Sequence, residues 1–346
     1  MKHGVWRGPI VHGGVLAVAL LFAWRTWTRP RAEPKRDAEV ALWEGRAADV
    51  SLVEYVGEKR SARVERKTEG GEPYLWVSVE RDKTPGPAKD AAAAAAAEPE
   101  KVAKAFVGGK QADELIEQWA SPRAARALGK IDAARLKDLG LADSKDTLAV
   151  VAQGKRRELR LGSKVYGGSE RFVMDARTQD VFVLSGGSIR DLEVGETSLM
   201  QRDLHRFEGK DAVGALLAAG KRTREVVRLA NSSKADEWAD AATPDRKDEA
   251  IGTWMGKVGQ LRALEYVGDE VALQASNPAS TPPEDVLRLD LRGEGGKALG
   301  FVELLRVPGE KDKFDYLVRT ETTRVLVKVA QRLGEQLEQD LPTLLP

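Results

Sequence analysis

Short runs of alternating apolar and polar residues, separated by glycine-containing turns, dominate the chain from residue 50 onward. The first group of runs covers residues 50–56, 62–66 and 74–79. In the third run Leu75, Val77 and Val79 alternate with polar or aromatic neighbours. An alternation of period two predicts strands that bury one face, and the intervening turns predict hairpins.

A helical block follows these strands. One apolar face is made of Ala112, Leu115, Ile116 and Trp119, and Pro122 marks the end of that helix. A second short helix is expected at residues 133–139, where Gly140 ends it. Four more strands are then expected at residues 148–151, 158–161, 171–175 and 180–184, with the tight turns of an antiparallel meander.

The second half of the chain has a similar pattern. A strand at residues 225–230 precedes a helix that we expect to begin at Thr243-Pro244-Asp245, because Thr caps helices well and Pro suits the first turn. The apolar face of this helix consists of Ile251, Trp254, Met255, Val258 and Leu261. Strands at residues 286–291, 299–307, 314–319 and 324–329, and a terminal helix with Leu333, Leu337 and Leu341, complete the half.

Two segments of the first half are similar to segments of the second. GEKRSARVER near Lys59 matches GKRTREVVR near Lys221, and RTQDVFVL matches TTRVLVKV, which aligns Asp180 with Arg324. The two spacings differ by the length of residues 83–100, an alanine- and proline-rich run that predicts a flexible insert. A single insertion would reconcile the spacings, although unrelated hairpin-helix-meander segments would also look alike.

The expected fold class is therefore α+β. Two related lobes of antiparallel strands with packed helices are expected at residues 48–204, which include the insert, and at residues 205–346.

The most apolar stretch lies near the N-terminus. Residues 8–24, GPIVHGGVLAVALLFAW, carry no formal charge; the residues at their two rims are Trp6, Arg7, Trp24, Arg25 and Trp27. A spanning helix needs ~17–25 apolar residues, and Trp and Arg favour the membrane interface. No small-residue cleavage pattern follows the apolar core. We therefore expect one uncleaved N-terminal transmembrane helix within residues 1–27, in contact with membrane lipid, and a linker at residues 28–47; a buried core helix is the alternative.

Two arguments about orientation disagree. More basic residues follow the apolar segment than precede it, which favours a cytoplasmic body under the positive-inside rule. Large domains, however, translocate largely regardless of charge. Our expectation is a single-pass inner-membrane protein with a periplasmic body.

Composition narrows the chemistry. Charged residues make up 32% of the 346 residues, yet the net charge is +1, so the field and the basic stripe typical of nucleic-acid binding are missing. The absence of cysteine excludes disulfides, thiolate nucleophiles and cysteine zinc sites. The three histidines are far apart, which does not favour a histidine metal site or a Ser-His-Asp triad. We expect no catalytic, cofactor or metal site.

A few polar residues are candidates for acid–base chemistry. Asp191, Asp203 and His205 would have to meet for acid–base catalysis, and their spacing does not bring them together. Glu303 and Asp315 are expected on facing strands. The simpler role for their carboxylates is an ion pair with a cross-strand partner such as Arg319.

Other residues have structural interpretations. The tryptophans Trp76, Trp119, Trp238 and Trp254 are expected in the core rather than in a ligand-stacking site. Gly186-Gly187-Ser188 is expected to be a strand-to-helix turn, because no phosphate-binding motif accompanies it.

The order of segments resembles a known family. It comprises the N-terminal anchor, DVSLVEYVGEKRSARVER…YLWVSV, LKDLGLADSKDTLAVVAQGKRRELRLG, ERFVMDARTQDVFVLSGGSIRDL and LMQRDLHRFEGKDAV. Over residues 48–267 it is similar to a bacterial family of domains of unknown function whose genes lie beside ABC transporters of the gliding-motility auxiliary type. The resemblance implies an extracytoplasmic, membrane-anchored accessory protein, and the family supplies no functional residue to carry over.

The functional expectation combines these points. The chain is expected to be a non-enzymatic accessory or scaffolding subunit that binds an ABC-type permease or ATPase, or another envelope protein complex. The alternatives are an envelope hydrolase and a membrane-tethered adaptor that faces the cytoplasm.

Overall fold

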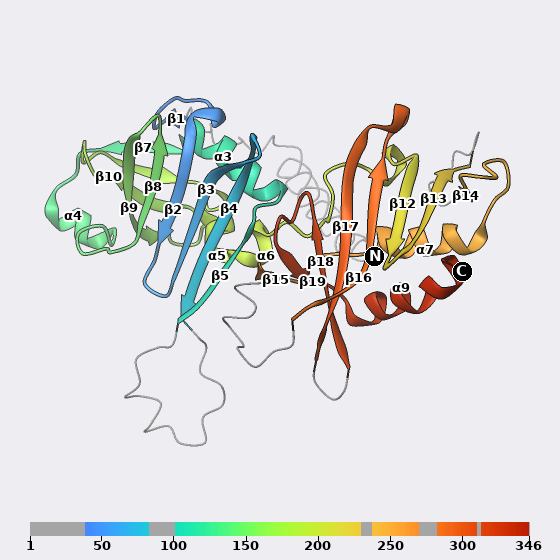
Figure 1. Cartoon of the computed structure of the whole chain (residues 1–346). Coiled ribbons are helices and arrows are strands. Elements are labelled where there is room, and N and C mark those ends of the chain that lie inside the picture. The colour runs from blue at the N-terminus through green and yellow to red at the C-terminus, as the bar shows by residue number, and fades with distance from the viewer. Residues whose placement is uncertain (1–38, 83–100, 230–236, 270–281, 310–312, 346) are drawn as a thin grey trace, which may run out of the picture.

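The computed structural model describes residues 39–82, 101–229, 237–269, 282–309 and 313–345. Within these ranges the chain forms two large antiparallel sheets, each packed on its own hydrophobic core (Figure 1). We call the part around the first core, from Val50 to Met200, the first lobe, and the part around the second core, from Leu204 to Leu345, the second lobe.

The first lobe contains a sheet with the strand order β5-β4-β3-β2-β8-β9-β10-β11-β7. Its strands are β2 (Val50–Val56), β3 (Arg60–Glu69), β4 (Glu72–Asp82), β5 (Lys101–Val107), β7 (Arg126–Gly129), β8 (Thr147–Ala152), β9 (Lys155–Lys164), β10 (Arg171–Asp175) and β11 (Val181–Leu184). Its helices are α3 (Lys110–Ala120), α4 (Ala133–Asp138), α5 (Gly187–Val194) and α6 (Glu196–Leu199). A small separate sheet pairs β1 (Val40–Ala41) with β6 (Arg123–Ala124).

The second lobe contains a sheet with the strand order β14-β13-β12-β16-β17-β18-β19-β15. Its strands are β12 (Gly214–Ala219), β13 (Arg222–Arg228), β14 (Trp238–Asp240), β15 (Glu265–Gly268), β16 (Glu284–Arg292), β17 (Ala298–Pro308), β18 (Phe314–Thr320) and β19 (Leu326–Lys328). Its helices are α7 (Glu249–Gly259) and α9 (Gln331–Leu344). Single 3-10 turns lie at Ala47–Asp49, Gly209–Asp211 and Glu294–Gly296.

The two sheets have the same order of equivalent strands. The hairpin β2–β3 corresponds to β12–β13, β4 to β14 and the meander β8–β11 to β16–β19. The edge strand β7 corresponds to β15, and each precedes its meander in the chain. Helix α3 corresponds to α7 and α5 to α9, and β5 is an additional edge strand of the first sheet. Arg60 and Arg222, which follow the matched Lys59 and Lys221, begin equivalent strands.

One matched pair is displaced by a residue. The sequence similarity aligns Asp180 with Arg324, but in the structure the equivalent of Arg324 is Gln179. Both residues take a left-handed backbone after the same kind of turn, with φ of 64° at Gln179 and 62° at Arg324. In one lobe Asp175 accepts the turn N–H groups, and in the other the hydroxyl of Thr320 does so.

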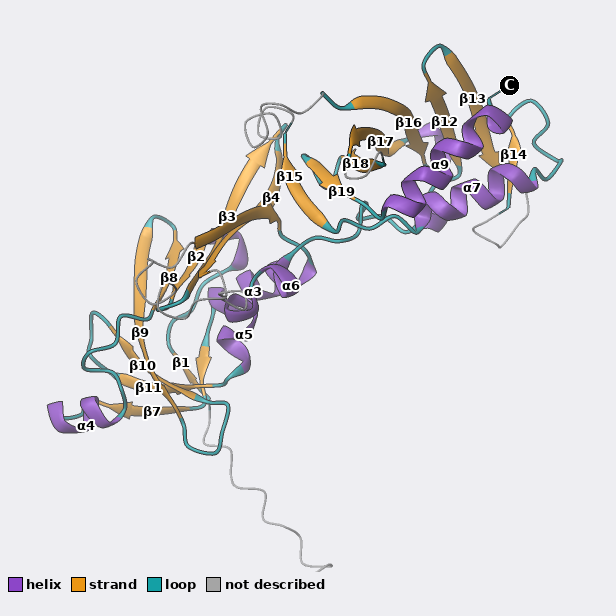
Figure 2. Cartoon of the chain, turned by 90° about the horizontal axis from the view of Figure 1, so that it is seen from below, coloured by secondary structure: helices purple, strands orange, loops and turns teal. Residues whose placement is uncertain are grey.

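Most helices lie on one side of the sheets; the exception is α4, whose Leu136 packs against Met174 and Val181 on the opposite face of the first sheet. In Figure 2 α3, α5 and α6 lie on the same side of the first sheet as α7 and α9 do on the second. In each lobe an indole N–H crosses between two helices: Trp119 donates to the carbonyl of Ser188, and Trp254 donates to that of Leu337. Buried tryptophan needs such a partner for its N–H, so these bonds fix the helix pairs against each other.

The expected α+β class is wrong. The described residues are mostly antiparallel β-structure in three sheets, and the helices are a minor part. The sequence pattern does not predict the strands β1, β5, β6, β7, β12, β14 and β15. Strands such as KVAKAFV and GALLAA are rich in alanine, lysine and leucine, which favour helices, and only pairing with neighbouring strands holds them extended.

The segment expected to anchor the chain in a membrane lies outside the described residues, as do Trp6, Arg7, Trp24, Arg25, Trp27 and residues 83–100. None of the helices in the described ranges combines the length and the apolar character needed to cross a lipid bilayer.

A helix start was also misplaced. Helix α7 begins at Glu249, and its N-cap is Asp248, whose carboxylate accepts the N–H groups of Ala250 and Ile251. Thr243 lies in the preceding turn. The apolar face itself is confirmed, because Ile251, Trp254 and Val258 are buried.

Candidate functional site at the lobe junction

A short backbone segment joins the two lobes. Gln201 donates its N–H to the carbonyl of Val107 at the end of β5 (2.9 Å), and Ala263 donates its N–H to the carbonyl of Arg202 (2.8 Å). Met200 also forms a β-bridge with Gly108, and Asp203 forms one with Arg262. The segment from Met200 to Asp203 is thus hydrogen-bonded to both lobes. Main-chain bonds on both sides limit the freedom of the connection.

Side chains between β5 and β15 reinforce this connection. The rings of Phe106 and Tyr266 lie 6.2 Å apart, and the Tyr266 hydroxyl donates to the carbonyl of Gln201 (3.0 Å). Burial raises the pKa of the Tyr266 hydroxyl well above its ordinary range. Lys104 bridges the carboxylates of Glu196 and Glu265 at 3.0 and 3.1 Å.

A second contact lies at the tip of the β3–β4 hairpin. Arg324, in the β18–β19 turn, places its guanidinium 3.0 Å from Glu69 and 3.5 Å from Glu72. The same guanidinium lies 4.3 Å from the ring centroid of Tyr74. Only 16% of the Arg324 side chain is exposed, so the hairpin of the first lobe largely covers it.

A pocket of about 420 Å³ opens beside this contact; we call it the junction pocket. Residues from both lobes form its walls: Glu72, Pro73, Tyr74, Arg206, Phe207, Lys297, Ala298, Leu299, Glu321, Thr322 and Arg324. Its volume lies within the range of ~300–1,000 Å³ typical of ligand pockets. The junction pocket is our candidate functional site.

The carboxylate of Glu321 makes three polar contacts within the protein. It lies 2.8 Å from Nδ1 of His205 and accepts the N–H of Phe301 (3.0 Å) and the hydroxyl of Thr322 (3.2 Å). The His205 ring stacks on Phe207, with centroids 4.6 Å apart. Nε2 of His205 is buried and has no hydrogen-bond partner among the described residues.

Two cations in the pocket wall are not neutralised. Arg206 and Lys297 are exposed, and within the described residues neither side chain makes a hydrogen bond or an ion pair. The field of Arg206 reaches Asp113 on α3 without forming an ion pair. The pocket therefore has an excess of positive charge at Arg206 and Lys297.

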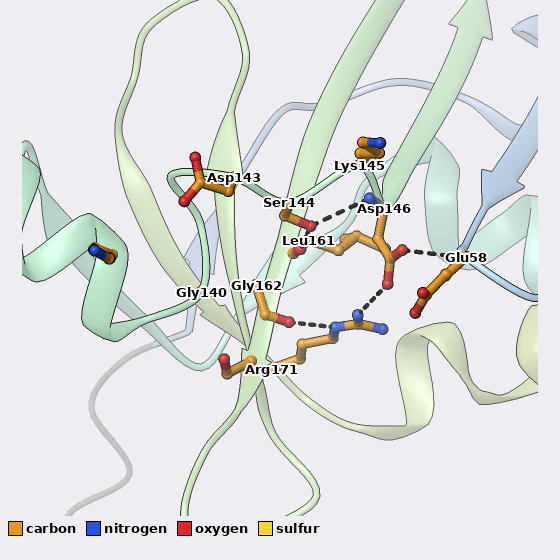
Figure 3. A pocket seen from close by; sticks show the side chains of 11 residues that line it. Glu58, Gly140, Asp143, Ser144, Lys145, Asp146, Leu161, Gly162 and Arg171 are labelled. Carbon is orange, nitrogen blue, oxygen red and sulfur yellow. Dashed lines mark hydrogen bonds and ion pairs between the residues drawn. The ribbon is translucent and has the colours of Figure 1, made fainter.

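A second pocket, of about 500 Å³, lies in the first lobe between α4, the connection before β8 and the start of β10 (Figure 3). Arg171 occupies its base and is fully engaged. It pairs with Asp146 (2.8 Å) and Glu193 (3.1 Å) and donates to the carbonyl of Gly162 (2.8 Å). Asp146 also accepts the N–H of Glu58. Because these groups satisfy one another, they hold the loops together rather than leave a reactive group available.

The residues weighed for acid–base chemistry have separate partners. Asp191 accepts a hydrogen bond from the Ser198 hydroxyl, Asp203 pairs with Arg262 at 3.0 Å, and His205 pairs with Glu321. The structure thus does not assemble the three into one site. It instead places His205 behind the wall of the junction pocket, against Glu321 and Phe207. The sequence pattern does not predict this contact, because Glu321 is far away in the chain.

The cross-strand interpretation of Glu303 is confirmed. Glu303 stands opposite Arg319 and binds it at 2.7 Å, and it also pairs with Arg288. Asp315 has a different partner, Lys328, at 2.7 Å.

The core positions of Trp119, Trp238 and Trp254 are confirmed, since each is at most 2% exposed. Trp76 is only half-buried, on the sheet face opposite the buried Leu75 and Val77, where Lys67 lies over its ring. The chain passes from strand to helix at Gly186, as expected, but Gly187 and Ser188 already form the start of α5. The Ser188 hydroxyl accepts a hydrogen bond from Gln118. Among the described residues, no group of three or more His, Asp or Glu side chains is arranged to hold a metal ion.

Residues 110–284 match the family described as a domain of unknown function (DUF4340). The match covers just over half of the chain. The chain belongs to this family. No curated protein matches the chain, and no solved structure does. The matched region begins at α3 and ends at the start of β16, so it contains the junction segment and parts of both lobes.

Proposed function

We propose that this protein is a non-catalytic accessory subunit, held at a membrane by its apolar N-terminal segment, that docks partner proteins of an ABC-type transport complex. The observation that carries the proposal is the arrangement of the two sheets. Apart from α4, which packs on the opposite face of the first sheet near β10 and β11, the helices lie on one side of both lobes, so the opposite faces of both sheets point the same way (Figure 2). We call these two faces together the open sheet surface.

The open sheet surface is charged but largely self-compensating. In the first lobe Glu54 on β2 pairs with Arg63 (3.5 Å) and Arg156 (3.0 Å). In the second lobe Glu303 joins Arg288 and Arg319 across three strands. Ion pairs between partly exposed side chains contribute little to stability, so exchanging one partner for another costs little free energy. Charged side chains of this kind are also the groups by which a protein surface selects a partner.

The proposed tether rests on the sequence. Residues 8–24 are uncharged and end on Trp24. Trp6 and Arg7 precede them and Arg25 and Trp27 follow them, as expected of a segment that contacts lipid. A tether of this kind keeps a weakly binding surface at high effective concentration beside a membrane complex. The location beside an ABC-type permease or ATPase comes from the family resemblance and is part of the proposal.

The test is co-purification of the full chain from its membrane in mild detergent. The double variant Arg63→Glu, Arg156→Glu reverses two half-exposed charges on the open sheet surface, and Lys110→Glu changes an 83% exposed side chain on α3 as the matched control. We expect the wild-type chain and the Lys110→Glu variant to retain a permease or ATPase that the double variant loses. Recovery of no transport component, or equal recovery with all three proteins, would contradict the proposal.

The side of the membrane needs a separate measurement. A reporter fused after Pro346 that is active only outside the cytoplasm is expected under the proposal. Activity only in the cytoplasm would support the tethered adaptor instead, and hydrolysis of envelope polymers by the purified chain would support the hydrolase.

A further inference from the structure

We infer that the junction pocket receives a carboxylate carried by an extended acidic segment of the docked partner, with Arg206 and Lys297 as the residues that bind it. This inference deepens the proposed function and rests on it, because the occupant is part of the protein that lies on the open sheet surface.

The pocket is continuous with that surface. Leu75 and Val77 of β4 point into the first core, so Tyr74 and Trp76 belong to the opposite, open face. Tyr74 is also a wall of the junction pocket, and its ring meets that of Trp76 edge to face, with centroids 6.5 Å apart. A chain that follows β4 along the open face therefore reaches the pocket directly.

The charges select an anion. Glu321 is satisfied by His205, Thr322 and the backbone of Phe301, whereas Arg324 is neutralised by Glu69 and Glu72. Arg206 and Lys297 remain without an ionic partner among the described residues. An arriving negative group gains two cations without breaking an ion pair of the protein.

The kind of anion follows from the same residues. Two carboxylates, those of Glu72 and Glu321, stand in the pocket wall and would repel a doubly charged phosphate more than a singly charged carboxylate. The planar guanidinium of Arg206 offers the parallel donors that a carboxylate accepts. Pro73, Phe207 and Leu299 supply apolar contact for the methylene groups that carry an aspartate or glutamate carboxylate.

The wall of the pocket is formed before a ligand arrives. Arg324 holds the Tyr74 ring from one side, and the His205–Phe207 stack is held by Glu321. Arg324 is thus a positioning residue, because its own donors are used by the hairpin of the first lobe. A preformed wall lowers the ordering cost of binding a flexible peptide.

The direct test measures binding of a fluorescent, end-blocked peptide with three consecutive glutamates to the full chain in detergent. The same peptide with glutamines is the reference. We expect the glutamate peptide to bind at least tenfold more tightly, and the double variant Arg206→Gln, Lys297→Gln to lose that preference. Arg202→Gln, an exposed arginine in the same connection that does not line the pocket, is the matched control and should bind as wild type does.

Several results would overturn the inference. These are equal binding of the two peptides, no binding up to 1 mM, or an equal loss with Arg202→Gln. Competition by succinate at the same carboxylate concentration as the peptide would assign the pocket to free dicarboxylates, and stronger competition by inorganic phosphate would assign it to phosphate.

The co-purification assay separates this inference from the proposed function. If the Arg206→Gln, Lys297→Gln variant keeps every partner that Arg63→Glu, Arg156→Glu loses, the open sheet surface docks the partner and the pocket inference fails alone. If both variants lose the same partner, both the docking surface and the pocket are supported.

Discussion

Arg324 and Glu69 connect the two lobes across 255 residues of sequence, with the Arg324 guanidinium 3.0 Å from the Glu69 carboxylate. Arg324 takes a left-handed backbone with φ of 62°, a conformation that costs a non-glycine residue energy. The turn thus directs a long cation at the tip of a hairpin in the other lobe. This contact closes one side of the junction pocket, and it suggests the first experiment.

Arg324→Asn should loosen the lobe contact without unfolding either lobe. Asparagine tolerates the left-handed backbone, so the substitution removes the guanidinium and keeps the turn. The carboxylates of Glu69 and Glu72 are well exposed, so we expect a loss of ~1–2 kcal/mol, mostly from the contact with Tyr74. Chemical denaturation measures the loss, and faster proteolysis within residues 200–206 would report the loosening.

The control for this experiment is the double variant Glu69→Gln, Glu72→Gln. It should cost less, because it leaves the ring contact of Arg324 intact. If Glu69→Gln, Glu72→Gln lowers the free energy of unfolding more than Arg324→Asn does, the ion pairs rather than the ring contact supply most of the stabilisation, and the prediction is wrong.

Gly334→Ala should destabilise the second lobe, whereas Gly256→Ala should stabilise it. A Cβ on Gly334 would lie 2.2 Å from Cγ of Tyr316, where α9 packs on β18, while a Cβ on Gly256 in α7 meets nothing within 4 Å. Overpacking costs ~1–3 kcal/mol, and alanine in an open helix position gains up to ~1 kcal/mol over glycine. Opposite shifts in the denaturation midpoint are expected; shifts of the same sign would show that α9 is not packed as described.

Asp248→Ala should cost at least ~1 kcal/mol, the usual contribution of a helix N-cap, because two backbone N–H groups of α7 lose their acceptor and Arg224 loses an ion pair at 3.0 Å. Thr243→Ala, in the preceding turn, should change the free energy of unfolding by less than half as much. Equal losses would restore Thr243 as the helix start. Helix content by circular dichroism gives a second measurement of the same difference.

Asp240 should make stability depend on acidic pH. The backbone N–H of Ala242 and the guanidinium of Arg224 hold the pKa of the Asp240 carboxyl below its ordinary value. A carboxyl whose pKa is lower in the folded state contributes stability at neutral pH, and that contribution is lost as the pH falls below about 4. Asp240→Asn should therefore be less stable than wild type at pH 7, and the difference should shrink on acidification.

Asp245→Asn is the control for the pH experiment, since Asp245 is an exposed carboxylate in the same connection. It should show no such pH-dependent difference. If the difference in free energy of unfolding between Asp240→Asn and wild type stays constant from pH 7 to pH 3, the lowered pKa of Asp240 is not its cause.

Local pattern predicted well those elements whose signal is contained in a few residues. The apolar face of α3 and the strands β2 and β10 are examples, because alternation and helical spacing act within one element. Trp76 was misplaced for the opposite reason. Its neighbours alternate correctly, but which face of β4 is buried depends on the helices α3 and α5, which are distant in sequence.

The junction pocket could not be found in this way. His205 and Arg206 were visible as residues of the connection, but Glu321 and Lys297 reach them only when the second sheet folds. Their approach is fixed by the order in which β16 to β19 pair, and no short-range pattern records that order.

By itself, then, the sequence determined the hairpins, the apolar helix faces and the similarity of the two halves, because these depend on spacing between near neighbours. The tertiary structure alone decided that the described residues are mostly β, that every helix except α4 lies on the same side of the two sheets, and that Arg324 reaches Glu69. Strand pairing and side-chain packing between distant segments set these features, and both override the local preferences of residues such as those in β5 and β12.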